Sequence, residues 1–158
     1  MASQTADGPP PRVGVGAIVS RPDGKVVVGK RLSPPGAGSM QMPGGHLEYG
    51  EDILHCAERE VLEETGLRVR GVKIVTVTNS VFEPEHLHYV TVITYCEVLE
   101  PDAEPRSLES DKCESWAWMS WDELRALKGD SAPGEVLFHP VHKVLDQPLD
   151  LESLRPPV

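Results

Sequence analysis

Cysteine, long apolar runs and basic residues are all scarce in this chain, and each shortage excludes a class of protein. The three cysteines, Cys56, Cys96 and Cys113, cannot all pair with one another, and no Cys-x-x-Cys spacing is present. We therefore expect free thiols in a reducing, cytoplasmic compartment rather than a disulfide framework or a zinc site. No stretch approaches the ~18 apolar residues of a membrane helix. Residues 1–11 lack the basic-then-apolar order of a secretory signal.

The shortage of positive charge excludes a further class of partner. Lys and Arg number 15 against 25 Asp and Glu, so the formal net charge is −10. Such a chain is a poor partner for nucleic-acid polymers and for anionic membranes. It can still act on a small phosphate compound if metal ions neutralise the negative charges of the phosphates and of the nearby acidic side chains. What matters is whether some of the acidic residues converge on one place.

The length of 158 residues suits one compact domain. Residues 1–11 contain a proline run and little apolar surface, which predicts a disordered N-terminal arm. Residues 151–158 read as a C-terminal tail. The domain is therefore expected over residues 12–150.

Turn and helix signals divide this domain into strands and helices. Two β-branched runs, Val13–Ser20 and Lys25–Lys30, flank the turn Arg21–Gly24 and predict a β-hairpin. Helices are expected over 51–65, where Gly66 follows, from the Ser120 capping box to Lys128, and over 136–146. Further strands are expected over 72–80, 88–99 and 115–119. The irregular alternation predicts an α/β fold with helices on both faces of a mixed sheet.

The first helix carries the acidic residues that point to chemistry. Glu60, Glu63 and Glu64 are spaced i, i+3, i+4, so they share one helix face. Like charges at this spacing repel by a few tenths of a kcal/mol per pair. Mg²⁺ prefers such hard oxygen ligands and would turn the repulsion into attraction. The ordinary alternative to a metal site is an acidic helix face that is simply solvated. The preceding Gly44-Gly45 pair also has two interpretations, a loop that places backbone groups near a phosphate or a simple turn.

The spacing of these residues decides between the alternatives. Gly45 is followed after five residues by Glu51, and after seven more by Arg59-Glu60, an apolar residue, Glu63-Glu64, Gly66 and an apolar Leu67. Seven fixed positions at roughly 6% usage coincide by chance in roughly 1 in 10⁸ to 10⁹ windows. The segment resembles the Nudix box at every position. Segments within residues 12–125 are also similar to the MutT-like nucleotide-pool hydrolases of animals and plants; they are 12–20, 29–31, 36–51, 79–80, 88–91 and 112–118.

The resemblance implies a fold, a cofactor and a reaction. The fold is an α/β/α sandwich around a mixed β-sheet, and the reaction is metal-dependent hydrolysis of a diphosphate linkage with Mg²⁺ or Mn²⁺. By position, Glu60, Glu63, Glu64 and the carbonyl of Gly44 match metal ligands, and Arg59 with Glu51 matches the pair that braces the site. Glu60 or Glu63 would orient or deprotonate the attacking water. Asp111 and Glu114 are alternative bases.

The same resemblance suggests which residues meet the substrate. Arg31, His46 and Gly45 would contact phosphates or the leaving group, and Arg31 has the planar fork that suits them. Val15, Met42, Thr91 and Phe138 would line a base or leaving-group pocket. One departure stands out, because His139 occupies the place where relatives usually have a tryptophan. Losing that stacking surface weakens the case for purine recognition.

Several functions remain open at this point. The first is a pyrophosphohydrolase of damaged or noncanonical nucleoside triphosphates, giving the monophosphate and diphosphate. The second is a hydrolase of non-nucleotide diphosphates such as prenyl diphosphates. A catalytically inactive Nudix binding module ranks below both, because every box residue is present. A generic acidic binding domain would require the box to be coincidence. Similarity to this branch also implies a possible homodimer.

Overall fold

The computed structural model describes residues 8–157, so most of the expected N-terminal arm lies outside the described residues. Strands and helices alternate irregularly along the chain, as expected. The elements are β1 (Arg12–Ser20), β2 (Val26–Arg31), β3 (Met40–Gln41), β4 (Gly44–His46), α1 (Ile53–Thr65), β5 (Val69–Phe82), β6 (Leu87–Val98), β7 (Cys113–Met119), α2 (Trp121–Lys128), α3 (His139–Asp146) and a 3₁₀ turn (Leu151–Ser153).

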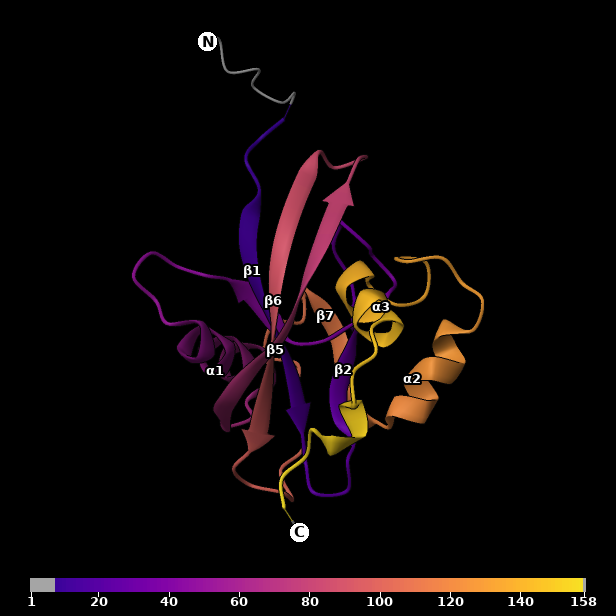
Figure 1. Cartoon of the computed structure of the whole chain (residues 1–158). Coiled ribbons are helices and arrows are strands. Elements are labelled where there is room, and N and C mark those ends of the chain that lie inside the picture. The colour runs from indigo at the N-terminus through magenta and orange to yellow at the C-terminus, as the bar shows by residue number, and fades with distance from the viewer. Residues whose placement is uncertain (1–7, 158) are drawn as a thin grey trace.

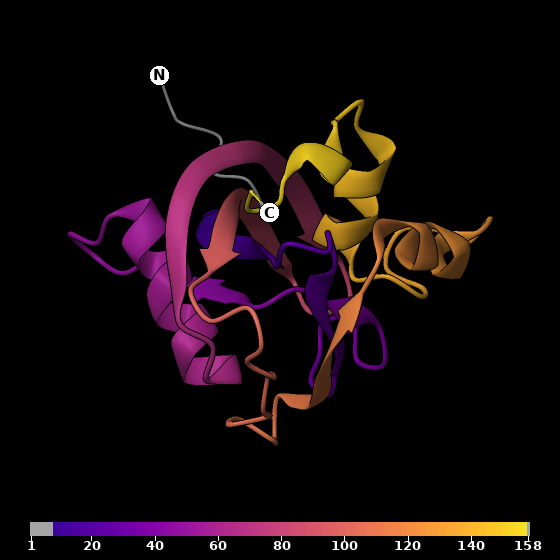
Figure 2. The same ribbon diagram turned by 90° about the horizontal axis from the view of Figure 1, so that it is seen from below.

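One mixed sheet organises these elements. Its main path runs β3-β2-β1-β6-β5, with β4 paired to β1 and β7 paired to β2. β1 and β6 are parallel and the other pairs are antiparallel. α1 covers one side of the sheet, and α2 and α3 lie on the other (Figure 1, Figure 2). The expected α/β/α sandwich is confirmed. Among residues 8–157, no helix is long and apolar enough to cross a membrane.

The alternation of side chains along β1 creates two cores. Val15, Ala17 and Val19 point to one face and pack in a cluster that includes residues of α1. Ile18, between them, points to the other face and packs in a cluster with residues of α2 and α3. Because strand side chains alternate between faces, one central strand can bury apolar groups in both layers.

Local capping sets the helix boundaries. The Asp52 side chain accepts hydrogen bonds from the backbone N–H groups of Leu54 and His55, so α1 begins after it rather than at Glu51. Gly66 ends α1 in the left-handed conformation, with φ 74°. The Ser120 hydroxyl caps α2, as the Ser-x-x-Glu pattern predicted. α3 begins at His139 rather than Val136, and proline occupies its first turn.

The C-terminal boundary was predicted wrongly. Leu151 is 2% exposed and Leu154 is 6% exposed, and both belong to the second core cluster. The short 3₁₀ turn that starts at Leu151 directs these side chains toward the core. The packed domain therefore extends at least to Leu154.

We expect Leu151→Ala to destabilise the protein by about 2–5 kcal/mol, because it removes a fully buried side chain and leaves a cavity. Leu127→Ala, on the exposed side of α2, is the matched control, since Leu127 is 42% exposed. The measurement is urea unfolding of both variants. Equal midpoints for the two variants would show that the C-terminal turn does not contribute to the core.

Candidate active site

Two glycines bring the Nudix-like segment into contact with the sheet. A Cβ on Gly44 would lie 2.2 Å from the carbonyl oxygen of Val15, and a Cβ on Gly45 would lie 2.3 Å from Cδ of Glu60. Neither position can hold a side chain in this arrangement. The two glycines thus let β4 pair closely with β1 while the Glu60 carboxyl group packs against the backbone of β4.

Arg59 connects the acidic residues of the segment. Its Nε and Nη2 donate to the two carboxylate oxygens of Glu51 at 2.7 and 2.9 Å, and its Nη1 donates to Glu60 at 2.9 Å and Glu63 at 3.3 Å. The hydrogen bonds from Arg59 lower the pKa of Glu51 to about 2. Its Nη2 also donates to the carbonyl of His46 at 3.3 Å. One guanidinium therefore ties the loop before α1 to the helix.

Glu64 is the most deeply placed carboxyl group of the cluster. It is 8% exposed and accepts a hydrogen bond of 3.0 Å from the backbone N–H of Gly44. The pKa of Glu64 is raised to about 8. Burial is the largest cause, the charges of Glu60 and Glu109 also raise this pKa, and the hydrogen bond from Gly44 opposes the rise. Burial also raises the pKa of Glu60. The carboxyl groups are crowded where water stabilises their charge poorly.

The sequence analysis missed Glu109 as a member of this group. Its charge raises the pKa values of both Glu60 and Glu64. It lies in the loop before β7, and the neighbouring Leu108 N–H donates to the carbonyl of Glu64 at 3.2 Å. No spacing rule links residue 109 to the helix, because this proximity depends on how the loop folds back.

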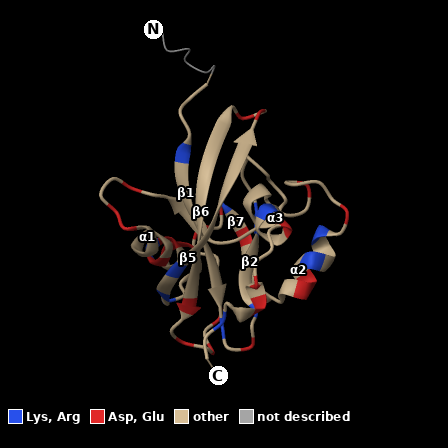
Figure 3. Ribbon diagram, viewed as in Figure 1, with Lys and Arg blue, Asp and Glu red and all other residues tan. Residues whose placement is uncertain are grey.

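Other predicted residues lie apart from the cluster centre. The Glu63 side chain is half exposed and turns toward Arg59. Glu114, a candidate base, forms an exposed ion pair with Lys30 at 3.7 Å. Within residues 8–157 no three acidic, histidine or cysteine side chains are already arranged as a metal site. Figure 3 shows acidic residues recurring along α1 and in the loop before it.

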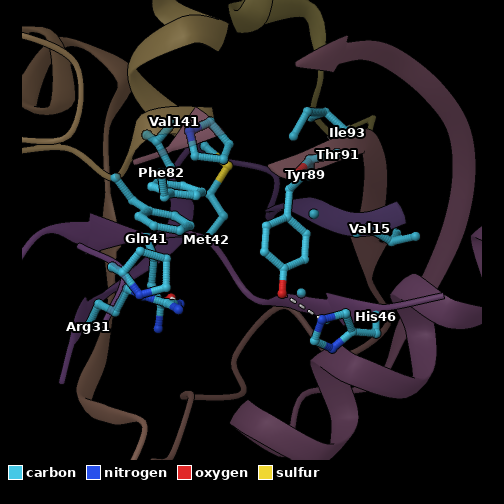
Figure 4. A pocket seen from close by; sticks show the side chains of 17 residues that line it. Val15, Arg31, Gln41, Met42, His46, Phe82, Tyr89, Thr91, Ile93 and Val141 are labelled. Carbon is cyan, nitrogen blue, oxygen red and sulfur yellow. Dashed lines mark hydrogen bonds between the residues drawn. The ribbon is translucent and has the colours of Figure 1, made fainter. Parts of the chain in front are cut away.

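A cavity of about 160 Å³ opens beside the Gly44–His46 strand that contacts the acidic residues of α1. Its walls are largely apolar and come from β1 to β6, from the start of α3 and from the loop before β3 (Figure 4). Most residues that were expected to meet the substrate line it, namely Val15, Arg31, Met42, Gly45, His46, Thr91 and Phe138, and so does Gly44, which was expected as a metal ligand. The lining residues that the sequence did not reveal include Gln41, Phe82, Tyr89, Ile93 and Val141.

Aromatic contacts shape one wall of the cavity. Phe82 stacks on Phe138 with ring centroids 5.7 Å apart and an angle of 8° between the planes. Cζ of Arg31 lies 4.4 Å from the centroid of the Phe138 ring, and Nη1 of Arg31 donates to Gln41 at 2.8 Å. Burial lowers the pKa of Arg31. The guanidinium is thus held at the wall by an aromatic face and an amide.

His139 does not line this cavity, contrary to the expectation from the sequence. Its Nδ1 lies 2.7 Å from the Ser80 hydroxyl, and its ring meets Phe82 edge-on with centroids 6.1 Å apart. The side chain therefore contacts β5 behind the aromatic wall. Of the two residues that His139 contacts in this way, Phe82 lines the cavity.

Comparison with known proteins decides the family. Residues 10–139 match the NUDIX domain. The chain belongs to the Nudix family. It is 30% identical over 89 residues to an ADP-ribose pyrophosphatase of Methanocaldococcus jannaschii, covering 56% of this chain and 52% of that one. It is 35% identical over 81 residues to an RNA pyrophosphohydrolase of Novosphingobium aromaticivorans, covering 51% of this chain and 48% of that one. This Nudix chain spans about half the length of these curated relatives.

Solved structures support the same assignment. A MutT NUDIX hydrolase from Burkholderia pseudomallei superposes with a TM-score of 0.71 at 28% identity, covering 89% of this chain and all of that one. A NUDIX hydrolase from Nitrosomonas europaea superposes with a TM-score of 0.70 at 26% identity, covering 87% of each chain. The Nudix fold of this chain therefore extends well beyond the box.

We expect Arg59→Lys to lower kcat/KM by roughly ten- to a hundredfold, because lysine cannot replace the fork that holds Glu51 and Glu60 together. Arg70→Lys is the matched control, since Arg70 makes an exposed pair with Glu97 across β5 and β6. Hydrolysis rates and melting temperatures of the two variants are compared. If Arg59→Lys behaves like Arg70→Lys, the guanidinium does not organise the site.

Proposed function

We propose that this Nudix protein is a metal-dependent pyrophosphohydrolase that cleaves a diphosphate linkage in a small molecule. The observation that carries the proposal is that the Glu60 carboxyl group packs against Gly45 and Glu64 accepts a hydrogen bond from the N–H of Gly44, two glycines that line a largely apolar cavity. Hydrolysis of such a linkage requires charge neutralisation and an aligned water more than covalent chemistry. The carboxylates suit the charged centre of the substrate, and the cavity suits the group attached to it.

The carboxyl cluster fits Mg²⁺, with Mn²⁺ as an alternative. These cations prefer oxygen ligands. Burial, and then the charges of Glu60 and Glu109, raise the pKa of Glu64 to about 8, and a bound cation would favour its ionised form. Glu60, Glu63, Glu64 and the carbonyl of Gly44 would hold the ion, together with Glu109. A bound ion would neutralise phosphate charge and lower the pKa of its water.

The protein's own residues would then align the reaction. Arg59 and Glu51 keep Glu60 in place, and Glu60 or Glu63 orients or deprotonates the attacking water. Arg31, His46 and Gly45 line the cavity, where they would contact phosphate oxygens. Met42, Thr91 and Phe138 would contact the attached group.

The proposed substrate is a nucleoside triphosphate, damaged or noncanonical, which would be cleaved to the monophosphate and diphosphate. The aromatic wall of Phe82 and Phe138 supports a flat attached group. Thr91 and Gln41 supply polar contacts at the cavity wall. The name of the archaeal relative, an ADP-ribose pyrophosphatase, is compatible with a nucleotide substrate. Membership in the MutT-like branch of animals and plants is part of this proposal.

A prenyl diphosphate is the second candidate. Met42, Ile93 and Val141 contribute to an apolar lining that suits an isoprenoid chain. Gln41 and Arg31 hydrogen bond to each other, so fewer polar groups remain free to recognise a base. An inactive binding module has less support, because the box residues are present and Arg59 holds Glu51, Glu60 and Glu63.

The wider setting is also a proposal. The three cysteines are free and buried, and burial raises the pKa of Cys56 to about 12, which fits structural thiols in a cytoplasmic protein. A homodimer remains a proposal that light scattering tests. The net charge of −10 disfavours RNA as the substrate, although the bacterial relative is named an RNA pyrophosphohydrolase.

We expect a substrate screen to reveal Mg²⁺-dependent hydrolysis of a small diphosphate compound. The panel contains canonical and oxidised deoxynucleoside triphosphates, ADP-ribose, geranyl diphosphate and a 5′-triphosphate RNA, each with Mg²⁺, Mn²⁺ or EDTA. Fastest cleavage of a triphosphate supports the first candidate, and fastest cleavage of geranyl diphosphate supports the second. Preference for the RNA rejects a small-molecule substrate, and full activity in EDTA rejects the metal requirement.

We expect Glu64→Gln to lower turnover by at least roughly a hundredfold while stabilising the metal-free protein at pH 8. The pKa of Glu64 is raised to about 8 in the folded state, so protonation of this carboxyl group favours folding. Its contribution to the free energy of unfolding is fully present below the ordinary pKa of 4.5. That contribution is lost as pH rises from 4.5 toward 8. Glutamine keeps an acceptor for Gly44 and carries no charge, so the variant lacks this loss.

The measurement is thermal melting at pH 5 and pH 8, with and without Mg²⁺, alongside turnover. Without metal, the variant should melt several degrees above wild type at pH 8, on the order of 1 kcal/mol, and close to it at pH 5. Mg²⁺ should raise the melting temperature of wild type only. Glu123→Gln, at an exposed position of α2, is the control, and it should change neither the turnover nor the pH dependence of the melting temperature. A variant that keeps wild-type turnover would contradict the role of Glu64.

A further inference from the structure

Tyr89 and His46 form a hydrogen-bonded pair at the edge of the cavity, next to the start of the Nudix box. The Tyr89 hydroxyl lies 2.9 Å from Nε2 of His46, and the ring centroids are 5.5 Å apart. Both residues line the cavity, and Figure 4 shows their side chains pointing toward each other at one side of it. His46 was predicted to contact the substrate, but nothing in the sequence pointed to Tyr89.

The sheet brings these residues together from opposite sides of β1. In the register of the sheet, His46 on β4 lies beside Gly14, and Tyr89 on β6 lies beside Arg12. A Cβ on Gly14 would lie 3.8 Å from Cδ1 of Tyr89 and 3.8 Å from the carbonyl oxygen of Gly45, which is ordinary van der Waals contact. The Tyr89 ring therefore passes close to the backbone of Gly14, the residue paired with His46.

Further contacts hold each partner. The edge of Phe82 packs against Tyr89 with centroids 6.4 Å apart and an angle of 67° between the planes. The carbonyl of His46 accepts a hydrogen bond from Nη2 of Arg59. The backbone of His46 is therefore tied to the carboxyl cluster, and its ring is tied to the cavity wall.

Counting polar hydrogens shows what this pair offers to a ligand. A neutral imidazole and a phenol carry one polar hydrogen each, and their mutual hydrogen bond uses one of them. If Tyr89 donates to Nε2, then Nδ1 of His46 keeps its hydrogen; if Nε2 donates, the Tyr89 hydroxyl keeps its own. Among the described residues, no hydrogen bond engages Nδ1 of His46. In either form the pair retains one donor for an anionic oxygen.

We propose that Tyr89 is a positioning residue: its hydroxyl donates to Nε2 of His46 and fixes the imidazole so that the Nδ1–H is presented to a substrate phosphate. The proposal rests on the proposed function, because it assumes that a diphosphate binds between the carboxyl cluster and the cavity. Fixing the ring before binding lowers the entropy lost when the phosphate is bound. Phenylalanine at position 89 keeps the ring packing and removes only the hydrogen bond.

The kinetic test compares Tyr89→Phe with wild type on whichever of dGTP, ADP-ribose and geranyl diphosphate the wild type cleaves fastest. We expect KM to rise roughly tenfold with kcat changed less than about twofold, as for loss of a contact made equally in ground and transition states. Tyr95→Phe is the matched control on the same strand, because its hydroxyl bonds to Glu97 away from the site, and its KM should not change.

A double variant shows whether Tyr89 acts through His46. In a His46→Gln background, Tyr89→Phe should raise KM by less than about twofold, because the ring that it positions is absent. A rise as large as in the wild-type background would overturn the proposal, since Tyr89 would then act independently. An unchanged KM in the single Tyr89→Phe variant would overturn it equally.

A spectroscopic measurement separates failure of this proposal from failure of the proposed function. Nitrogen-15 NMR of the histidine rings, with His46 assigned by its loss in His46→Gln, reports which ring nitrogen carries hydrogen. Wild type should show one predominant tautomer, and Tyr89→Phe should shift both His46 nitrogen signals toward averaged values. Identical His46 signals in the two proteins overturn the pairing without any assay of hydrolysis. If wild type cleaves none of the compounds in the panel, the proposed function is overturned.

Discussion

The hydrogen bonds from Arg59 to Glu51 and Glu60 are the interaction on which the site depends. They hold acidic residues of a loop and a helix in one arrangement, while the Glu60 carboxyl group packs against the bare Cα of Gly45. A single guanidinium balances only part of the local negative charge. The fold therefore keeps carboxyl groups at positions where they repel one another, and a cation is the simplest means of compensating them.

The central strand β1 positions this arrangement within the domain. β1 pairs with β4 on one side and with β6 on the other, and it contributes to both apolar cores. The same strand thus positions the Gly44-Gly45 loop against α1 and the cavity wall on β6. The carboxyl groups of α1 and the cavity wall on β6 are therefore both positioned by β1, so a shift in the register of the sheet would move them apart.

The cavity explains why the family does not by itself define a substrate. The box residues lie at its edge, whereas its wall is built by Phe82 from the end of β5, by Phe138 before α3 and by Arg31 at the end of β2. These wall residues lie outside the box and can vary while the carboxyl cluster stays the same. Function at the level of reaction type and function at the level of substrate therefore depend on different parts of the chain.

The sequence alone determined the local features of this protein. The spacing from Gly45 to Leu67, the Gly66 end of α1 and the Ser120 cap all involve residues within a few turns of chain, so propensity and spacing suffice to predict them. The tertiary structure decided what depends on distant partners. Glu109 joins the cluster through a loop that returns to α1, Tyr89 reaches His46 across 43 residues of sequence, and His139 turns to Ser80 rather than to the cavity. The contacts of Tyr89 and His139 follow from the parallel register of β1 and β6 and from the packing of α3 against β5, which no local pattern encodes.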